Sequence, residues 1–310
     1  MSGTTIEWTD VTWNPVRGCS RVSPGCDHCY AMGQAHRFSG PGIQDPSGDR
    51  GLDKAPGPYH GLTVIRPKTA SRPGVDWSGR VRFVPEMLAA PLRWREPQRV
   101  FVNSMSDLFH DGLSNEAIAA VFGVMAVCPQ HNFQVLTKRP KRAAEWFAWA
   151  ANLHAGSAVG ADAIIRALGS FAHLLAPSNA TAQAQRTCHA LKIAWPLPNV
   201  WLGVSVEDRA AKYRIDELRD LPAALRFLSL EPLLEDLGEL GLRGIGWVIT
   251  GAESGNGART MNEEWVRSLR DQCSATGVPF FYKQKLEGKN KVGLPLLDGR
   301  QWAEFPKVQP

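Results

Sequence analysis

The stretch Arg99-Val100-Phe101-Val102-Asn103 is the first of six short apolar runs in the chain. The other five are Phe133–Thr137, Val200–Val204, Leu225–Ser229, Trp247–Gly251 and Val278–Tyr282. All six are dense in Val, Ile, Phe and Leu. Such runs are typical of strands buried within a parallel sheet.

The segments between these runs have helical spacing. They cover residues 115–127, 139–153, 208–221 and 263–276, and the first and last begin with plausible N-caps at Ser114 and Asn262, followed by acidic residues. Strands alternating with helices predict an α/β fold with a partial or closed (β/α) barrel. We expect one domain over residues 1–310.

Two segments depart from this alternation. Residues 36–80 are rich in Gly, Pro, Asp and Arg, and predict a loop-rich region with one short strand near Leu62–Ile65. Residues 155–196 are rich in Ala and carry two apolar helical patches, which favours a helical insertion between two strand-helix units.

Polar residues follow every one of the six apolar runs. The carboxyl ends of parallel strands meet at one edge of a sheet, where α/β proteins gather their working residues. The sequence therefore predicts one polar cavity lined by Asn103–Asp107, Thr137–Arg139, Ser205–Asp208, Ser229–Glu231, Gly251–Ser254 and Lys283–Gln284.

The composition is that of a folded globular protein. The chain has 310 residues, of which 44% are hydrophobic and 21% charged, and these values are typical of a folded globular protein. It contains no apolar run of the roughly 20 residues that a membrane span needs, and the N-terminus lacks signal-peptide features. We therefore expect a cytoplasmic protein with no membrane contact. The net charge of +5 permits an acidic partner such as nucleic acid.

Three of the six cysteines cluster near the N-terminus, as Cys19-x6-Cys26-x2-Cys29. Thiolates separated by Gly and Pro suit a soft metal, and three ligands would leave the fourth iron of a [4Fe-4S] cluster open to a small molecule. Two alternatives remain open. A structural zinc site could use His28 or His36 as its fourth ligand, or the three cysteines could simply be buried. The single Cys128, Cys188 and Cys273 indicate no disulfide framework.

The cysteine loop, with His28 before its last cysteine and Tyr30-Ala31 after it, resembles the cluster loop of radical S-adenosylmethionine (SAM) enzymes. That group usually has C-x3-C-x2-C spacing, so the x6 gap is a departure. The opening Asn14-Pro15-x-x-Gly18-Cys19 resembles the branch of spore photoproduct lyase. The whole chain is similar to a phage-associated three-cysteine-motif family. The similarity covers Ile6–Thr9, Trp13–Pro15, Ser104–Phe109, Leu136–Pro140, Gly203–Glu207, Ser229–Leu234, Gly251–Gly255 and Phe280–Gln284.

This resemblance implies a barrel of radical-SAM type that binds a [4Fe-4S] cluster through Cys19, Cys26 and Cys29. The open iron would chelate SAM, and an electron from a donor such as a ferredoxin or flavodoxin would cleave it to a 5′-deoxyadenosyl radical. The substrate is unknown and possibly nucleic acid, in DNA repair or modification. The alternative function is a nucleic-acid-binding protein without catalysis, stabilised by zinc or sensing redox state through an iron-sulfur cluster.

The resemblance also implies roles for residues around SAM. Asp107, with Ser104 and Ser106, corresponds to the site for its amino group, and Lys138 or Arg139 could pair with its carboxylate. Ser205 and Glu207 stand where ribose hydroxyls bind, and Gly251 where the backbone approaches adenine. His28 and Tyr30 could pack on adenine. Glu231 and Glu253 complete the expected cofactor-binding set, without separate roles.

Overall fold

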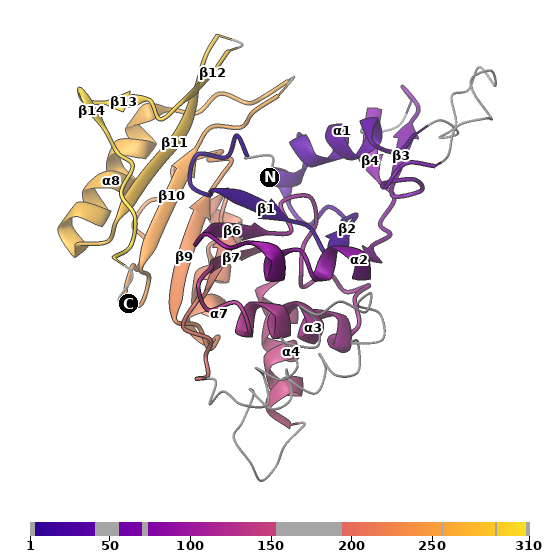
Figure 1. Ribbon diagram of the computed structural model, residues 1–310. Helices are drawn as coiled ribbons and strands as arrows, with labels where there is room; N and C mark the ends of the chain where they lie inside the picture. The colour runs from indigo at the N-terminus through magenta and orange to yellow at the C-terminus, as the bar shows by residue number, and fades with distance from the viewer. Residues whose placement is uncertain are drawn as a thin grey trace.

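An eight-stranded sheet, curled into a half-barrel, forms the frame of the protein (Figure 1). The structure is a computed structural model, and it describes residues 4–40, 56–69, 74–152, 194–255, 257–288 and 290–307. The strands are, in spatial order, β1 (Val11–Trp13), β6 (Arg99–Val102), β7 (Asn132–Thr137), β8 (Val200–Ser205), β9 (Leu225–Leu230), β10 (Trp247–Gly251), β11 (Phe280–Glu287) and β12 (Asn290–Gly293).

The strands from β1 to β11 are all parallel to their neighbours, and β12 returns antiparallel to β11. The six predicted strands are confirmed. Two strands were not predicted: the three-residue β1, and β12. Within the described residues no pairing joins β1 to β12, so the barrel is partial and the closed alternative is wrong.

Four helices cover the outer face of the sheet: α3 (Asn115–Ala126), α4 (Pro140–Asn152), α7 (Tyr213–Arg219) and α8 (Glu263–Thr276). The predicted N-caps are confirmed, since Ser114 Oγ accepts a hydrogen bond from Ala117 N and Asn262 Oδ1 accepts one from Glu264 N. A short 3₁₀ helix, η3 (Arg209–Ala211), precedes α7. No helix in the described part of the chain is long and apolar enough to span a membrane.

The inner face of the half-barrel has its own aromatic core. Because strand side chains alternate between faces, neighbours such as Phe227 and Leu228 belong to different cores. The ring of Trp8, which comes just before β1, fills the hollow with its centroid 4.6 Å from that of Phe101 and 6.2 Å from that of Trp247. The inner cluster consists of Trp8, Phe101, Trp201, Phe227, Trp247, Ile249 and Phe281.

A small N-terminal unit, which we define as the described residues from 14 to 84, lies beside β1, apart from α3, α4 and α7 (Figure 1). In it α1 (Tyr30–Arg37) packs on a hairpin of β3 (Thr63–Arg66) and β4 (Gly74–Trp77) through Met32, Leu62 and Trp77. A second pair joins β2 (Val16–Arg17) to β5 (Arg82–Phe83). The remaining short elements of the chain are η1 (Pro24–Cys26), α2 (Pro85–Leu88), η2 (Pro91–Arg93), β13 (Leu296–Leu297) and β14 (Arg300–Gln301).

Two sequence predictions fall wholly or partly outside the described residues. In the region 36–80 the expected strand is present as β3 and pairs with β4, while residues 41–55 and 70–73 are not described. The proposed helical insertion at 155–196 lies outside the described residues up to position 193.

Candidate functional site

One large cavity lies between the carboxyl ends of the sheet strands and the N-terminal unit. Its empty volume is about 1190 Å³, and part of this space is open to solvent. All six predicted strand ends contribute to its wall, and its floor is the aromatic inner core, through Trp8 and Phe101. The lining residues include Cys19, Cys26, His28, Cys29, Tyr30, Ser104, Ser106, Asp107, Lys138, Arg139, Ser205, Glu231 and Glu253. Two members of the expected set, Glu207 and Gly251, are not part of the lining.

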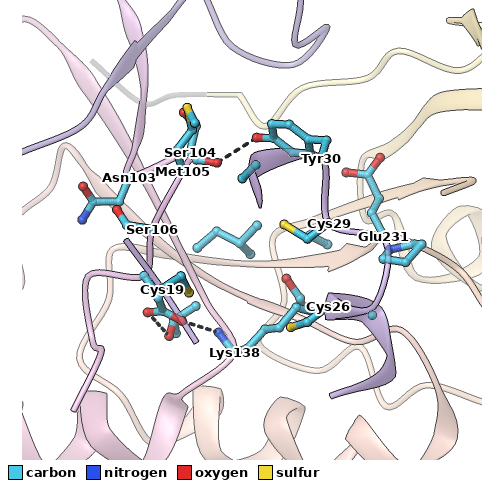
Figure 2. A pocket seen from close by; sticks show the side chains of 18 of the residues that line it. Cys19, Cys26, Cys29, Tyr30, Asn103, Ser104, Met105, Ser106, Lys138 and Glu231 are labelled. Carbon is cyan, nitrogen blue, oxygen red and sulfur yellow. Dashed lines mark hydrogen bonds between the residues drawn. The ribbon is translucent and has the colours of Figure 1, made fainter. Parts of the chain in front are cut away.

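The three clustered cysteines point into this cavity from one loop, and Figure 2 shows their sulfur atoms spaced around the hollow. Gly18 starts the loop at φ +87°, and a Cβ there would lie 2.2 Å from Arg80 O, so only glycine fits. Cys26 ends the short helix η1, and Cys29 is the N-cap residue of α1. Cys19 lies outside any helix or strand, so the three thiols stand in three different local structures.

Two of these thiols have groups nearby that suit a bound thiolate. Burial and the Asp107 carboxylate raise the pKa of the Cys19 thiol to about 12, and the neighbouring Arg139 guanidinium only partly opposes that rise. Burial likewise raises the pKa of Cys29, and the backbone N–H groups of Ala31 and Met32, at the start of α1, oppose it. A bound metal would add the positive charge that such buried thiols need in order to ionise.

Asp107 and Arg139 connect the cysteine loop to the sheet. The Asp107 carboxylate accepts hydrogen bonds from Thr137 Oγ1 at 2.8 Å, Lys138 N at 3.1 Å and Arg139 Nη1 at 3.0 Å. Arg139 Nη2 donates to both the backbone and the side-chain oxygen of Ser20, at 3.1 and 2.8 Å. Both oxygens of Asp107 are thus engaged, and the residue braces the loop next to Cys19.

Glu207 forms a second set of ion pairs that supports the cysteine loop; we call each such set a brace. Its side chain is fully buried and pairs with Lys138 Nζ at 2.7 Å and Arg214 Nη1 at 3.1 Å. Burial favours a raised pKa, but the two cations outweigh it and lower the pKa of Glu207. Gly25 lies directly on this pair, because a Cβ there would approach Glu207 Cγ to 2.9 Å.

A third brace joins β10 to the loop. Arg259 Nε donates to Glu253 Oε2 at 2.9 Å, and Arg259 Nη2 donates to Pro24 O at 2.9 Å. The Nδ1 atom of His28 lies 3.9 Å from Glu253 Oε2. Burial tends to raise the pKa of Glu253, but Arg259 outweighs that effect and lowers it.

The serines predicted near SAM are also partly engaged. Ser106 Oγ donates to Val16 O at 2.8 Å, and Ser104 Oγ donates to Asn14 Oδ1 at 3.3 Å. Tyr30 Oη donates to Ser104 O at 2.8 Å, as Figure 2 shows. Its ring remains 42% exposed, so it stays available at the cavity mouth.

The wall opposite the cysteines is less occupied. Lys283 Nζ lies 3.3 Å from Glu231 Oε1 and donates a hydrogen bond to Glu231 Oε2 at 3.4 Å. Burial raises the pKa of Glu231, and Lys283 only partly opposes this. Within the described part of the chain, no residue hydrogen-bonds the side-chain hydroxyls of Ser205 or Ser229, which line the cavity nearby. This wall has the free polar groups that a ligand would need.

A family model matches residues 3–306, and its description is a protein of unknown function, DUF5131. The chain belongs to the DUF5131 family. No curated protein and no solved structure matched it. The matched range contains the half-barrel, the cysteine loop and the cavity of this DUF5131 chain.

The thiols, as the structure places them, do not form a site for a single metal ion. One zinc ion needs its ligands to converge to about 2.3 Å from a single point. Among the described residues, no three His, Cys, Asp or Glu side chains are gathered in that way. Figure 2 shows the three thiols spaced around a hollow.

Several supporting residues were missed by the sequence analysis. Arg214 is 2% exposed although it lies on α7, where a polar residue is expected to face solvent. Asn103 was predicted to line the cavity, but its supporting role was not: it adopts φ 61°, and its Oδ1 accepts a hydrogen bond from Val16 N at 3.2 Å. Arg21 holds Asp27 and Asp76 together at 3.1 and 2.7 Å. An Asn directly after an apolar run was the only available signal, because Asn tolerates left-handed backbone.

Proposed function

We propose that this chain is an iron-sulfur enzyme of radical-SAM type, in which Cys19, Cys26 and Cys29 hold a [4Fe-4S] cluster. The observation that carries the proposal is the position of the three thiols. They face one cavity at the carboxyl ends of a parallel half-barrel, opposite a wall with free polar groups. Cofactor chemistry on such a fold belongs at this edge of the sheet.

The cluster and SAM together supply, when bound, the one-electron reductive cleavage of the SAM sulfonium. The chain's own residues bind and orient the ligand. Glu231 is suited to bind an amino group or a ribose diol, because its carboxylate lies on this wall, where Lys283 Nζ already contacts it. The hydroxyls of Ser205 and Ser229 add donors and acceptors on the same wall.

The floor and the mouth of the cavity protect the chemistry. Trp8, Phe101 and Leu136 close the floor with apolar side chains, and so keep water from that side. The Tyr30 ring stands at the mouth, held by its hydrogen bond to Ser104 O, and offers a flat surface for adenine.

The braces suggest other roles for three expected ligand residues. Asp107, Glu207 and Glu253 are already paired with Arg139, Lys138 and Arg259, and each pair contacts the cysteine loop or a residue next to it. We infer that they position the thiols. Ligand binding by these carboxylates would first require their present partners to move, and a buried charge without its partner is costly.

The test is metal and product analysis on the full chain purified without oxygen. We expect about four irons and four sulfides per chain, and 5′-deoxyadenosine from SAM after reduction with dithionite. A chain with one zinc and no iron would overturn the cluster. A chain with the cluster that fails to cleave SAM would overturn the enzymatic part and favour the redox sensor.

Replacing one cysteine of the cavity tests which thiols are ligands. We expect Cys26→Ala to lose the intact cluster and all SAM cleavage, while circular dichroism shows that the sheet remains folded. The matched control is Cys273→Ala, since Cys273 is buried in α8 and does not line the cavity. Loss of iron in the control alone, or equal loss in both variants, would contradict the assignment.

A further inference from the structure

The N-terminal unit carries unbalanced positive charge beside the cavity. Its two acidic residues in the described part, Asp27 and Asp76, are already paired with arginines. A set of its cations contacts no carboxylate among the described residues: Arg17, Arg37, Lys68, Arg80 and Arg82. The excess is local, because the whole chain carries only +5.

Two of these cations are directly opposite each other in a sheet. In the β2–β5 pair, Arg17 is the register partner of Arg82. Like charges at opposite positions of an antiparallel pair are destabilising. Arg80 is a further exposed cation, two positions before Arg82 in the chain. Such a cluster is relieved by an anion bound across it.

The arginines are anchored by their surroundings, not neutralised. Arg17 Nη1 donates weakly to Pro58 O at 3.5 Å, and its guanidinium lies 5.6 Å from the centre of the Tyr59 ring. Arg82 Nη2 donates to His60 O at 3.0 Å. Each guanidinium keeps further N–H donors free, and the side chains of Arg80 and Arg82 are exposed.

Tyr59 and Met105 connect this arginine surface to the cavity. Tyr59, which contacts Arg17 on one side, directs its hydroxyl to Met105 Sδ at 3.6 Å on the other. Met105 lines the cavity. Arg17 is also only two residues before Cys19, a span of at most about 7 Å. Arg17 is therefore connected to the cavity wall through Tyr59 and Met105.

We propose that Arg17, Arg80 and Arg82 form a contact surface for the phosphate backbone of a nucleic acid. Arg17 and Arg82 are register partners, and the forked donors of an arginine fit phosphate oxygens in pairs. The exposed aromatic ring at the cavity mouth is the kind of group on which an unpaired base stacks. The surface stands independently of the proposed cluster, because none of its residues is a thiol.

The test is fluorescence anisotropy of labelled single-stranded and double-stranded DNA with the full-length chain, at several salt concentrations. We expect Arg80→Glu/Arg82→Glu to weaken binding at least tenfold. The slope of log K against log salt should become shallower by about 0.7 for each phosphate that the variant no longer neutralises on a single strand, or about 0.9 on a duplex. Thermal melting verifies that the variant is folded.

The matched control is Arg93→Glu/Arg95→Glu, which has the same spacing and the same change in net charge. Arg93 and Arg95 are exposed and lie around η2, outside the N-terminal unit. We expect this control to bind within about twofold of wild type, as is usual for a surface charge that does not touch the ligand. Equal weakening in both variants would show a general charge effect and overturn the proposal.

Two further results would overturn it. One is a wild-type chain that binds neither DNA form at low salt. The other is tighter binding to phosphatidylserine vesicles or polyglutamate, with DNA unable to compete, which would assign the surface to a membrane or an acidic protein. None of these measurements uses SAM or a reductant. Failure here therefore leaves the enzyme proposal intact, and a colourless chain that binds DNA leaves this proposal intact.

Discussion

The two ends of the sheet's inner face differ sharply in composition. At the amino-terminal ends of the strands the face carries Trp201, Phe227, Trp247 and Phe281, all essentially inaccessible to solvent. Toward the carboxyl ends the same face changes to small and charged residues, including Ser205, Ser229, Glu231 and Lys283. One set of strands therefore supplies a core at one end and a cavity at the other.

The difference shows that one end of the sheet contributes mainly to stability, while the other end carries the groups of the cavity. Aromatic burial near Trp8 contributes to folding in proportion to the apolar area removed from water. Buried charges such as Glu231 contribute little or oppose folding, because desolvation costs more than one partner returns. Substitutions at the two ends should consequently have opposite effects on stability and activity.

The largest stability effect is expected at the aromatic end, from Trp247→Ala. This side chain is fully buried, contacts several rings and donates to Glu304 O at 2.8 Å. We expect the free energy of unfolding to fall by about 3–5 kcal/mol, measured by urea denaturation. Trp149→Ala, at a partly exposed site on α4, should cost clearly less. Equal losses in the two variants would mean that the inner aromatic core contributes no more to the free energy of unfolding than a partly exposed site does.

The boundary between the two ends is tested by Gly203→Ala. A new Cβ at Gly203 would lie 2.4 to 2.6 Å from atoms of the Phe227 ring. We expect a loss of about 1–3 kcal/mol from overpacking. Gly33→Ala is the control, because the space around Gly33 in α1 is open and alanine favours helix, giving a gain of up to about 1 kcal/mol. Thermal melting would show the two opposite signs.

The smallest stability effect, and one of opposite sign, is expected for Glu231→Gln. Burial raises the pKa of Glu231, so the folded state holds this proton more tightly than the unfolded state does. Wild-type stability therefore decreases as the pH rises above the ordinary value of 4.5 and through the raised pKa. At neutral pH we expect the variant to gain about 0.5–1 kcal/mol.

The same variant should form 5′-deoxyadenosine more slowly, because glutamine removes the charge that we assign to ligand binding. Denaturation curves at pH 4 and pH 7.5 provide the check, since at the lower pH the gain should be lost. A variant that is less stable than wild type at neutral pH would contradict the assigned direction of the pKa change.

Much of the fold could be predicted from the sequence. The strands around Phe101, Phe133 and Trp247 are largely buried on both faces, so their runs are rich in apolar residues even without alternation. The strand β1 was missed because Val11-Thr12-Trp13 is too short to show a pattern, and its place depends on pairing with β6, far along the chain. Non-local pairing of this kind leaves no local signal.

Most residues that line the cavity could be predicted from the sequence. The hydrogen bonds and ion pairs between their side chains could not. The cysteine spacing and the polar strand ends lead to one cavity because topology alone brings strand ends together. Sequence could not reveal that Asp107 is saturated by Thr137 and Arg139, or that Arg214 reaches Glu207 from α7. These contacts depend on side-chain geometry, which spacing does not encode.

The three braces of the cysteine loop have a consequence for how the protein is made. The loop leaves the ribosome first, but its supports follow much later, and Arg259 is 235 positions after its acceptor at Pro24. A nascent chain therefore exposes its thiols long before anything can shape them. Delivery of the proposed cluster should follow chain release, so a C-terminally truncated chain that lacks β10 and Arg259 would leave its cysteines open to oxidation.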